Sequence, residues 1–138
     1  MYYLKKVSKM RDSNNKLIAE FMGGIQSSSN IIRLPQTIGE SSIFCVKGSE
    51  GLPSGTFKVE RINELEYDTS WDWLMPVVEK IELLGYTFEK NFQPIDKDWQ
   101  CLIVKGNDIL YQEFNTDSLI ACHYVVIEFI KWYNNKNK

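Results

Sequence analysis

The chain has 138 residues, of which 43% are hydrophobic and 25% are charged. This composition excludes a disordered, collagen-like or membrane-spanning chain, and it suits a soluble domain that holds a core without disulfide or metal staples. The sequence has no run of about 18 apolar residues, no apolar stretch of a secretory leader, and an odd number of cysteines. We therefore expect a reduced, cytoplasmic protein that has no membrane segment.

Charges are segregated along the chain, although the formal net charge is only −2. Residues 1–16 carry a net charge of +4 and residues 131–138 carry +3, whereas the body between them, residues 17–130, carries −9. Such an asymmetry is found in a solvated acidic domain with basic ends, and also in a surface that selects partners by charge.

The N-terminal half gives irregular structural signals. Residues 1–13 are interpreted as a basic extension with a strand over 1–7, and a first helix is expected over 15–22, where Gly23 and Gly24 end it. Two short strands are expected at 31–34 and 42–47. A half-buried strand is expected over 56–67, where the apolar alternation slips and indicates a bulge.

The second helix is expected over 70–84, with Thr69 as its N-cap and Gly85 as its end. Pro76 lies well inside this segment, so it either kinks the helix or marks its true first turn. The apolar spacing of 3.6 residues defines a core stripe on this helix. Its members are Leu74, Val77, Val78, Ile81 and Leu84.

The C-terminal part gives the clearest pattern. A strand is expected over 86–92, and a hairpin is expected from 99–105 and 108–114, because Gly106-Asn107 is a strong turn signal. The last helix should cover 118–133, capped by Thr116 or Asp117. Its apolar residues fall on more than one side, since Val125 and Trp132 lie off the main stripe. That stripe comprises Leu119, Cys122, Val126, Phe129, Ile130 and Tyr133.

These elements predict an α+β fold, with a mostly antiparallel sheet and about three helices packed as an α/β sandwich. The expected organisation is a single domain over 14–134, preceded by the extension 1–13 and followed by a polar tail over 135–138. The tight hairpin and the short connection after the second helix favour this fold over a doubly wound parallel sheet.

Catalytic and metal-binding patterns are scarce in the sequence. His123 is the only histidine, and its neighbour Cys122 points elsewhere on a helix, so a Cys–His pair would need Cys45 or Cys101 to approach through the fold. No zinc-ligand spacing and no glycine-rich phosphate loop is present. We therefore expect no catalytic residues, no metal and no cofactor; an enzyme whose turnover depends on Cys101 or His123 is the least favoured alternative.

Acidic and aromatic residues suggest a binding surface instead. Residues 60–82 carry a local net charge of −5, and the four tryptophans exceed what a small core needs. Tryptophan is enriched at interface hot spots, and acidic surfaces occupy basic grooves of partners. Core packing and helix-dipole complementation are the simpler explanations of the same residues. The predicted partner-binding residues are Glu64, Glu66, Asp68, Trp71, Asp72 and Trp73.

The basic ends offer an alternative, which is nucleic-acid contact by phosphate-binding side chains. The acidic body opposes this interpretation, since phosphates would be repelled by it. The predicted contact residues of this alternative are Lys5, Lys6, Lys9, Arg11 and Lys131.

Three blocks of sequence resemble a family of small, uncharacterised proteins from phages and prophages of Bacteroidetes-type bacteria. They are NNKLIAEFMGG at 14–24, YDTSWDWLMPVVEKIELLGY at 67–86 and VVIEFIKWYN at 125–134. Related phage domains are described as α-β-α sandwiches, and the resemblance implies no catalytic residue. It implies a non-enzymatic protein that binds and inhibits a host defence complex. The most concrete version is an anti-CRISPR-like inhibitor of an RNA-guided nuclease and its guide RNA.

Overall fold

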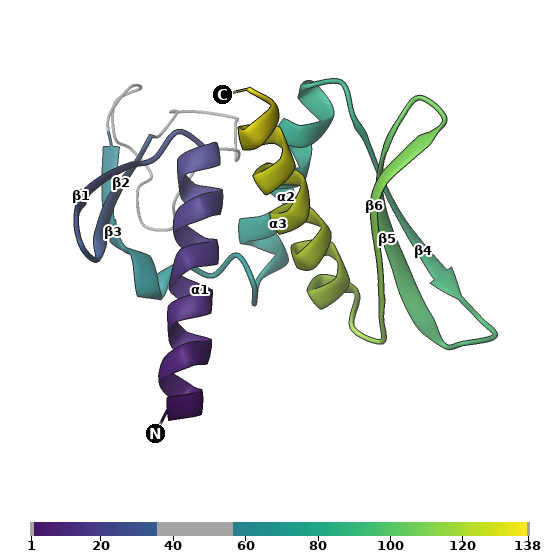
Figure 1. Ribbon diagram of the computed structural model, residues 1–138, viewed down its shortest axis with the longest axis horizontal. Helices are drawn as coiled ribbons and strands as arrows, with labels where there is room; N and C mark the ends of the chain where they lie inside the picture. Colours follow the sequence, from purple (N-terminus) through teal and green to yellow (C-terminus); the bar gives the residue numbers. More distant parts are fainter. Residues whose placement is uncertain (1, 36–56, 138) are drawn as a thin grey trace. The chain divides into compact units, whose positions relative to one another are not determined.

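The computed structural model describes residues 2–35 and 57–137, and it divides the chain into two compact units, Met1–Glu66 and Tyr67–Lys138. The described residues form three α-helices and two three-stranded antiparallel sheets, one in each unit, which confirms the predicted α+β fold (Figure 1). The strands are thus divided between two sheets rather than gathered into one. The prediction of a single domain over 14–134 concerns cooperative folding and stays a prediction.

Unit 1 contains one long helix and a small sheet of strand order β1-β2-β3. Gly23 adopts a positive φ of 94° just after the helix, and Gly24 follows so closely that a Cβ there would lie 2.8 Å from the carbonyl oxygen of Ala19. Glycine at this point therefore lets the chain turn tightly back toward the sheet. The elements are α1 Tyr2–Phe21, β1 Ile25–Ser28, β2 Ile31–Pro35, β3 Phe57–Arg61 and the 3₁₀ helix η1 Ile62–Glu64.

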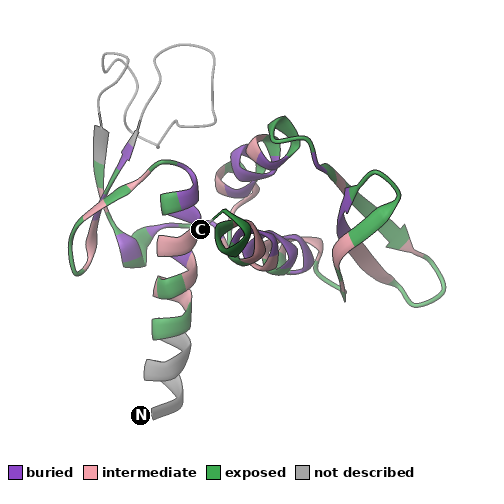
Figure 2. Ribbon diagram, turned by 45° about the horizontal axis from the view of Figure 1, so that its top comes forward, coloured by how far each residue is buried: buried purple, intermediate pink, exposed green. Residues whose placement is uncertain are grey.

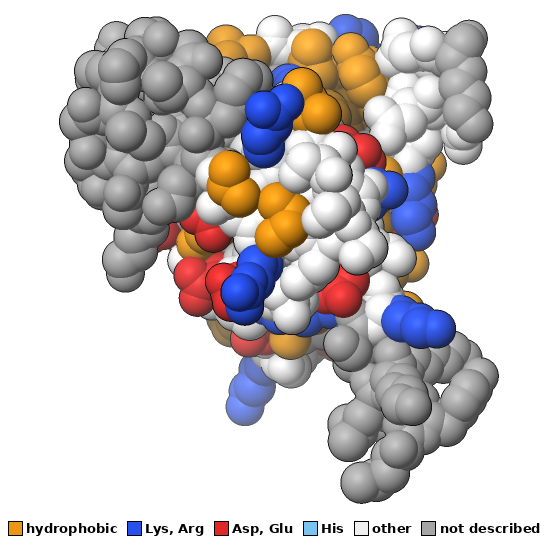
Figure 3. Space-filling model, turned by 90° about the vertical axis from the view of Figure 1, so that its left-hand side faces the viewer, with side chains coloured by type: hydrophobic (Ala, Val, Ile, Leu, Met, Phe, Trp, Pro, Cys, Tyr) orange, Lys and Arg blue, Asp and Glu red, His pale blue; other side chains and the backbone are white. Residues whose placement is uncertain are grey.

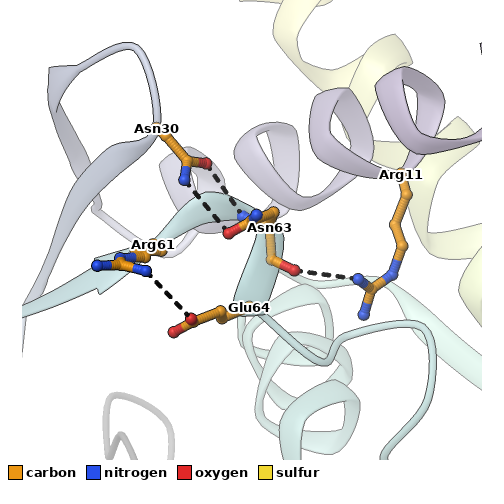
Figure 4. A network of polar contacts seen from close by, with 5 residues as sticks. All are labelled: Arg11, Asn30, Arg61, Asn63 and Glu64. Carbon is orange, nitrogen blue, oxygen red and sulfur yellow. Dashed lines mark hydrogen bonds and ion pairs between the residues drawn. The ribbon is translucent and has the colours of Figure 1, made fainter. Parts of the chain in front are cut away.

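Polar side chains of α1 hold the end of η1 in unit 1. Asn15 is fully buried, and its Nδ2 donates to the carbonyl oxygens of Ile62 at 3.0 Å and Leu65 at 3.1 Å. Arg11 donates to the carbonyl oxygen of Asn63 at 3.1 Å (Figure 4) and to that of Leu65 at 3.1 Å. The last carbonyls of a helix lack partners further along it, and these two side chains supply donors to them at the end of η1.

Several sequence-based expectations for unit 1 are wrong. The predicted strand over 1–7 is wrong, and the first helix begins at Tyr2 rather than at Asn15. Strand β1 was not expected, and the long strand predicted over 56–67 ends at Arg61, where η1 replaces the expected bulge. The strand at 31–34 is confirmed as part of β2. The strand predicted over 42–47 lies outside the described residues.

Unit 2 has the element order helix, three strands, helix, with strand order β4-β5-β6. Helix α3 packs on β5 and β6, while α2 contacts β4 and α3. The buried residues of α3, coloured purple in Figure 2, lie between Ala121 and Ile130. The elements are α2 Trp71–Leu83, β4 Thr87–Gln93, β5 Asp98–Lys105, β6 Asp108–Asn115 and α3 Ser118–Lys136.

Most expectations for unit 2 are confirmed. Gly85 ends α2 with a φ of 101°, Gly106 turns the hairpin with a φ of 62°, and the carboxylate of Asp117 accepts from Leu119 N at 2.9 Å as the N-cap of α3. Two details are wrong: Ser70, not Thr69, is the N-cap of α2, and Leu84 is 37% exposed. The burial of several sides of α3 follows from its contacts with both the sheet and α2. The largest fully buried side chains of the unit are Leu74, Val77, Val78, Ile81, Ile103, Val125, Val126, Phe129 and Ile130.

A row of three glutamines crosses the sheet of unit 2. Gln93 on β4 donates to Gln100 on β5 at 3.4 Å, and Gln100 donates to Gln112 on β6 at 2.9 Å. The register places Gln100 opposite Asn91 and Phe114, so the row runs diagonally over one face of the sheet. It links all three strands by side-chain hydrogen bonds in addition to the backbone ladder.

Candidate partner-binding surface

The start of α2 carries half of the predicted partner-binding residues. Trp71, Asp72 and Trp73 form the first turn of the helix, and the carboxylate of Asp72 is exposed there. A negative charge in the first turn complements the helix dipole, so Asp72 stabilises the helix that presents the two indoles. Asp68 lies three residues before the helix and is half-buried.

The remaining predicted carboxylates belong to the other unit. Glu64 lies in η1 and is exposed, and its Oε1 lies 3.8 Å from the guanidinium Nη1 of Arg61 (Figure 4). Glu66 is exposed at the last position of unit 1. The structure therefore brings together Asp68, Trp71, Asp72 and Trp73 within unit 2, and it leaves Glu64 and Glu66 in unit 1.

Trp71 belongs to a cluster that sequence reasoning did not find. The Nζ of Lys90 on β4 lies 4.7 Å from the centroid of the Trp71 ring and 5.2 Å from that of Trp99 on β5. Phe92 packs against Trp99 at 5.2 Å with the rings tilted by 60°, yet it remains 48% exposed. We call Trp71, Lys90, Phe92 and Trp99 the aromatic cluster. The register of β4 and β5 and the packing of α2 against β4 bring these residues together, so no spacing in the sequence signals the cluster.

Trp73 has a different environment. Its ring packs edge-on against Tyr67, with centroids 5.2 Å apart and an interplanar angle of 87°. Tyr67 is only 4% exposed, so this contact ties the segment before α2 to the first turn of the helix. Trp73 is half-buried and contributes to packing as well as to the surface.

Several of the remaining aromatic residues pack against one another on α3 and just after α2. Tyr86 lies edge-on to Phe129 at 4.9 Å and to Trp132 at 5.9 Å, while Tyr133 stacks on Phe129 at 5.7 Å. The Nζ of Lys136 lies 5.0 Å from the Trp132 centroid. These rings form part of the core and its border, so Trp132 does not need a partner to account for it.

Four of the five basic residues of the alternative interpretation lie on α1, and the fifth, Lys131, lies on α3. Arg11 is held by the carbonyls of η1, and Lys131 lies 3.8 Å from Glu128 on α3. Lys9 is exposed on α1, whose acidic residues are Asp12 and Glu20. Figure 3 likewise shows basic and acidic side chains interspersed among the described residues of the face it presents. Lys5 and Lys6 lie in α1 at positions whose side chains are not described.

The two described cysteines are buried in unit 2. The thiol of Cys122 donates a hydrogen bond to Cys101, and this hydrogen bond raises the pKa of Cys122. The same hydrogen bond lowers the pKa of Cys101; burial opposes that shift, and the positive charge of Lys90 adds to it. Cys101 on β5 also donates to the carbonyl oxygen of Ser118 at 3.7 Å. Both thiols are fully buried, so they pack between the sheet and α3.

Among the described residues, no group of three or more His, Cys, Asp and Glu side chains is arranged to hold a metal ion. None of the described helices combines the length and the apolar character needed to cross a membrane.

Comparison with protein-family models, curated proteins and solved structures gives no match for this chain. The resemblance to phage and prophage proteins therefore stays a prediction.

Proposed function

We propose that the chain is a binding protein whose acidic, aromatic surface at the start of α2 engages a basic surface of a partner protein. The observation that carries this proposal is the position of Trp71 in an accessible aromatic cluster next to the exposed carboxylate of Asp72. Indole rings supply most of the affinity in such surfaces, while carboxylates select a basic partner and speed association.

The net charge of unit 2 supports a basic partner. Residues 67–138 carry 11 acidic and 7 basic side chains, so the unit that bears the aromatic cluster has a net charge of −4. Phosphate groups would be repelled by this unit, which favours a protein target over free nucleic acid.

The most concrete target is the nucleic-acid channel of an RNA-guided nuclease, which makes the chain an anti-CRISPR-like inhibitor of host defence. Such channels are lined with basic residues that hold the heteroduplex backbone, so an acidic protein surface can compete for them. The resemblance to phage and prophage proteins is the second support, and it points to a bacterial host as the source of the target.

Capture of the partner tests the proposal. The tagged chain is incubated with lysate of a related bacterium, with and without nuclease treatment, and the bound protein is identified and purified. We expect a protein with a basic surface that is retained after nuclease treatment and whose nucleic-acid binding is blocked by the chain. Recovery of RNA or DNA alone, lost at high salt, would overturn the proposal in favour of the nucleic-acid-binding alternative.

A pair of charge variants locates the surface. Asp68→Asn combined with Asp72→Asn should weaken capture by the purified partner at least about tenfold, since two carboxylates near the anchor are removed. Glu79→Gln combined with Glu82→Gln is the matched control, because it removes the same charge from exposed positions later in α2. Equal affinity of both double variants would show that the start of α2 is not the contact surface.

A further inference from the structure

Two indole rings in the aromatic cluster face the same cation. Lys90 lies on β4, Trp71 in the first turn of α2, and Trp99 on β5, so three separate elements converge on one ammonium group. The register pairs Lys90 with Cys101, and Trp99 is two residues away on the same face of the sheet. The faces of aromatic rings attract cations, and tryptophan does so most strongly.

We propose that Trp71 and Trp99 form a binding site for a cationic side chain of the partner, and that Lys90 occupies this site in the free protein. The proposal rests on the proposed function, because it names what the basic surface of the partner would place there. Phe92 packs on Trp99 and fixes the orientation of that ring. Asp72 is exposed in the same first turn of α2 as Trp71.

Lys90 can leave the site at low cost. The residue is exposed, and its long side chain can return the ammonium group to water. Its only advantage over an external cation is its tether, which acts as an effective concentration in the millimolar range. A partner that brings a guanidinium or ammonium group together with other contacts overcomes this advantage. Lys90 is therefore a built-in competitor, and its removal should strengthen binding of a free cation.

The experiment uses the purified full-length chain and tetramethylammonium as the probe, followed by NMR of the four indole N–H signals. Lys90→Met keeps a long side chain but removes the charge. We expect this variant to bind the probe at least about threefold more tightly than the wild type, with shifts confined to Trp71 and Trp99. Lys97→Met is the matched control, because Lys97 is an exposed lysine of the same hairpin, and it should bind as the wild type does.

Three outcomes would overturn the proposal. The first is equal affinity of Lys90→Met and the wild type, and the second is a response at Trp73 or Trp132 instead of Trp71 and Trp99. The third is equal binding of neopentyl alcohol, a neutral probe of similar size, which would show simple apolar contact. Circular dichroism of each variant confirms that the fold is kept.

The result is separable from that of the proposed function, since the probe experiment needs no partner. Cation binding by Lys90→Met together with unchanged capture by the Asp68 and Asp72 double variant would support the site and reject the acidic surface. Loss of capture in that double variant, together with no cation binding by Lys90→Met, would support the acidic surface and reject the cation site.

Discussion

The two units are stabilised in different ways. In unit 1, the buried Asn15 and the half-buried Arg11 of α1 donate hydrogen bonds to the carbonyls at the end of η1. Unit 2 encloses a larger apolar core between two helices and a sheet, and the ring contacts described above all lie within it. Their net charges also differ in sign, +2 for residues 1–66 and −4 for residues 67–138. Among the described residues, unit 1 buries eight apolar side chains and unit 2 buries seventeen, so in unit 1 these hydrogen bonds add to a smaller apolar core.

The largest effect is expected in the core of unit 2. Phe129→Ala should lower the free energy of unfolding by about 3–5 kcal/mol, because it removes a fully buried ring that Tyr86, Trp132 and Tyr133 contact. Urea unfolding followed by tryptophan fluorescence measures this change. Tyr124→Ala, at a position of α3 that is 50% exposed, is the control and should cost much less. Equal losses in the two variants would contradict an apolar core centred on Phe129.

The polar centre of unit 1 is the second test. Asn15→Ala should cost about 1–3 kcal/mol, because the carbonyls of Ile62 and Leu65 lose a buried donor. The neighbouring Asn14→Ala is the control and should be nearly neutral. Urea unfolding followed by the helical signal in circular dichroism gives the unfolding midpoint. An unchanged midpoint in Asn15→Ala would show that these hydrogen bonds do not stabilise unit 1.

The same variant tests whether the two units unfold together. All four tryptophans lie in unit 2, so their fluorescence follows unit 2 alone. If the chain is one cooperative domain, as the sequence predicts for 14–134, Asn15→Ala should shift the fluorescence and circular dichroism midpoints together. A fluorescence midpoint that stays fixed would show two independent domains.

A smaller effect is expected at the start of α3. Asp117→Ala should cost about 1 kcal/mol, because its carboxylate accepts from Leu119 N and Ile120 N as the N-cap. Thermal unfolding measures the loss, with Thr116→Ala as the control at the alternative cap position. A greater loss of stability in the Thr116 variant would show that Thr116, and not Asp117, caps the helix.

The smallest effect is expected at the Arg61–Glu64 ion pair of unit 1. Both side chains are more than half exposed, so Glu64→Gln should change the free energy of unfolding by no more than about 0.5 kcal/mol. Urea unfolding in low salt gives the strictest measurement, since salt screens such pairs. A loss of several times this size would show that the pair is part of the structural network of unit 1.

The sequence predicted unit 2 well because its signals are local. The glycines at 85 and 106 and the cap at Asp117 mark the element ends, and the apolar spacing marks the buried faces. Unit 1 was predicted poorly, since α1 has few apolar residues before Asn15 and the serine-rich β1 resembles a loop. The functional residues followed the same rule. Trp71 and Asp72 stand out in the sequence, whereas Lys90 and Trp99 meet Trp71 only through strand register and helix packing.

The glutamine row on the sheet of unit 2 has a direction. Each side-chain amide donates through its nitrogen and accepts through its oxygen, so the row runs from Gln93 through Gln100 to Gln112. It ends in an acceptor oxygen at the β4 edge and in a donor nitrogen at the β6 edge. Rotating the amide of Gln100 alone would place like atoms against both neighbours, so the two hydrogen bonds favour one orientation of this amide. The two edges of the sheet therefore differ in what these side chains offer to water or to another molecule, an acceptor at β4 and a donor at β6.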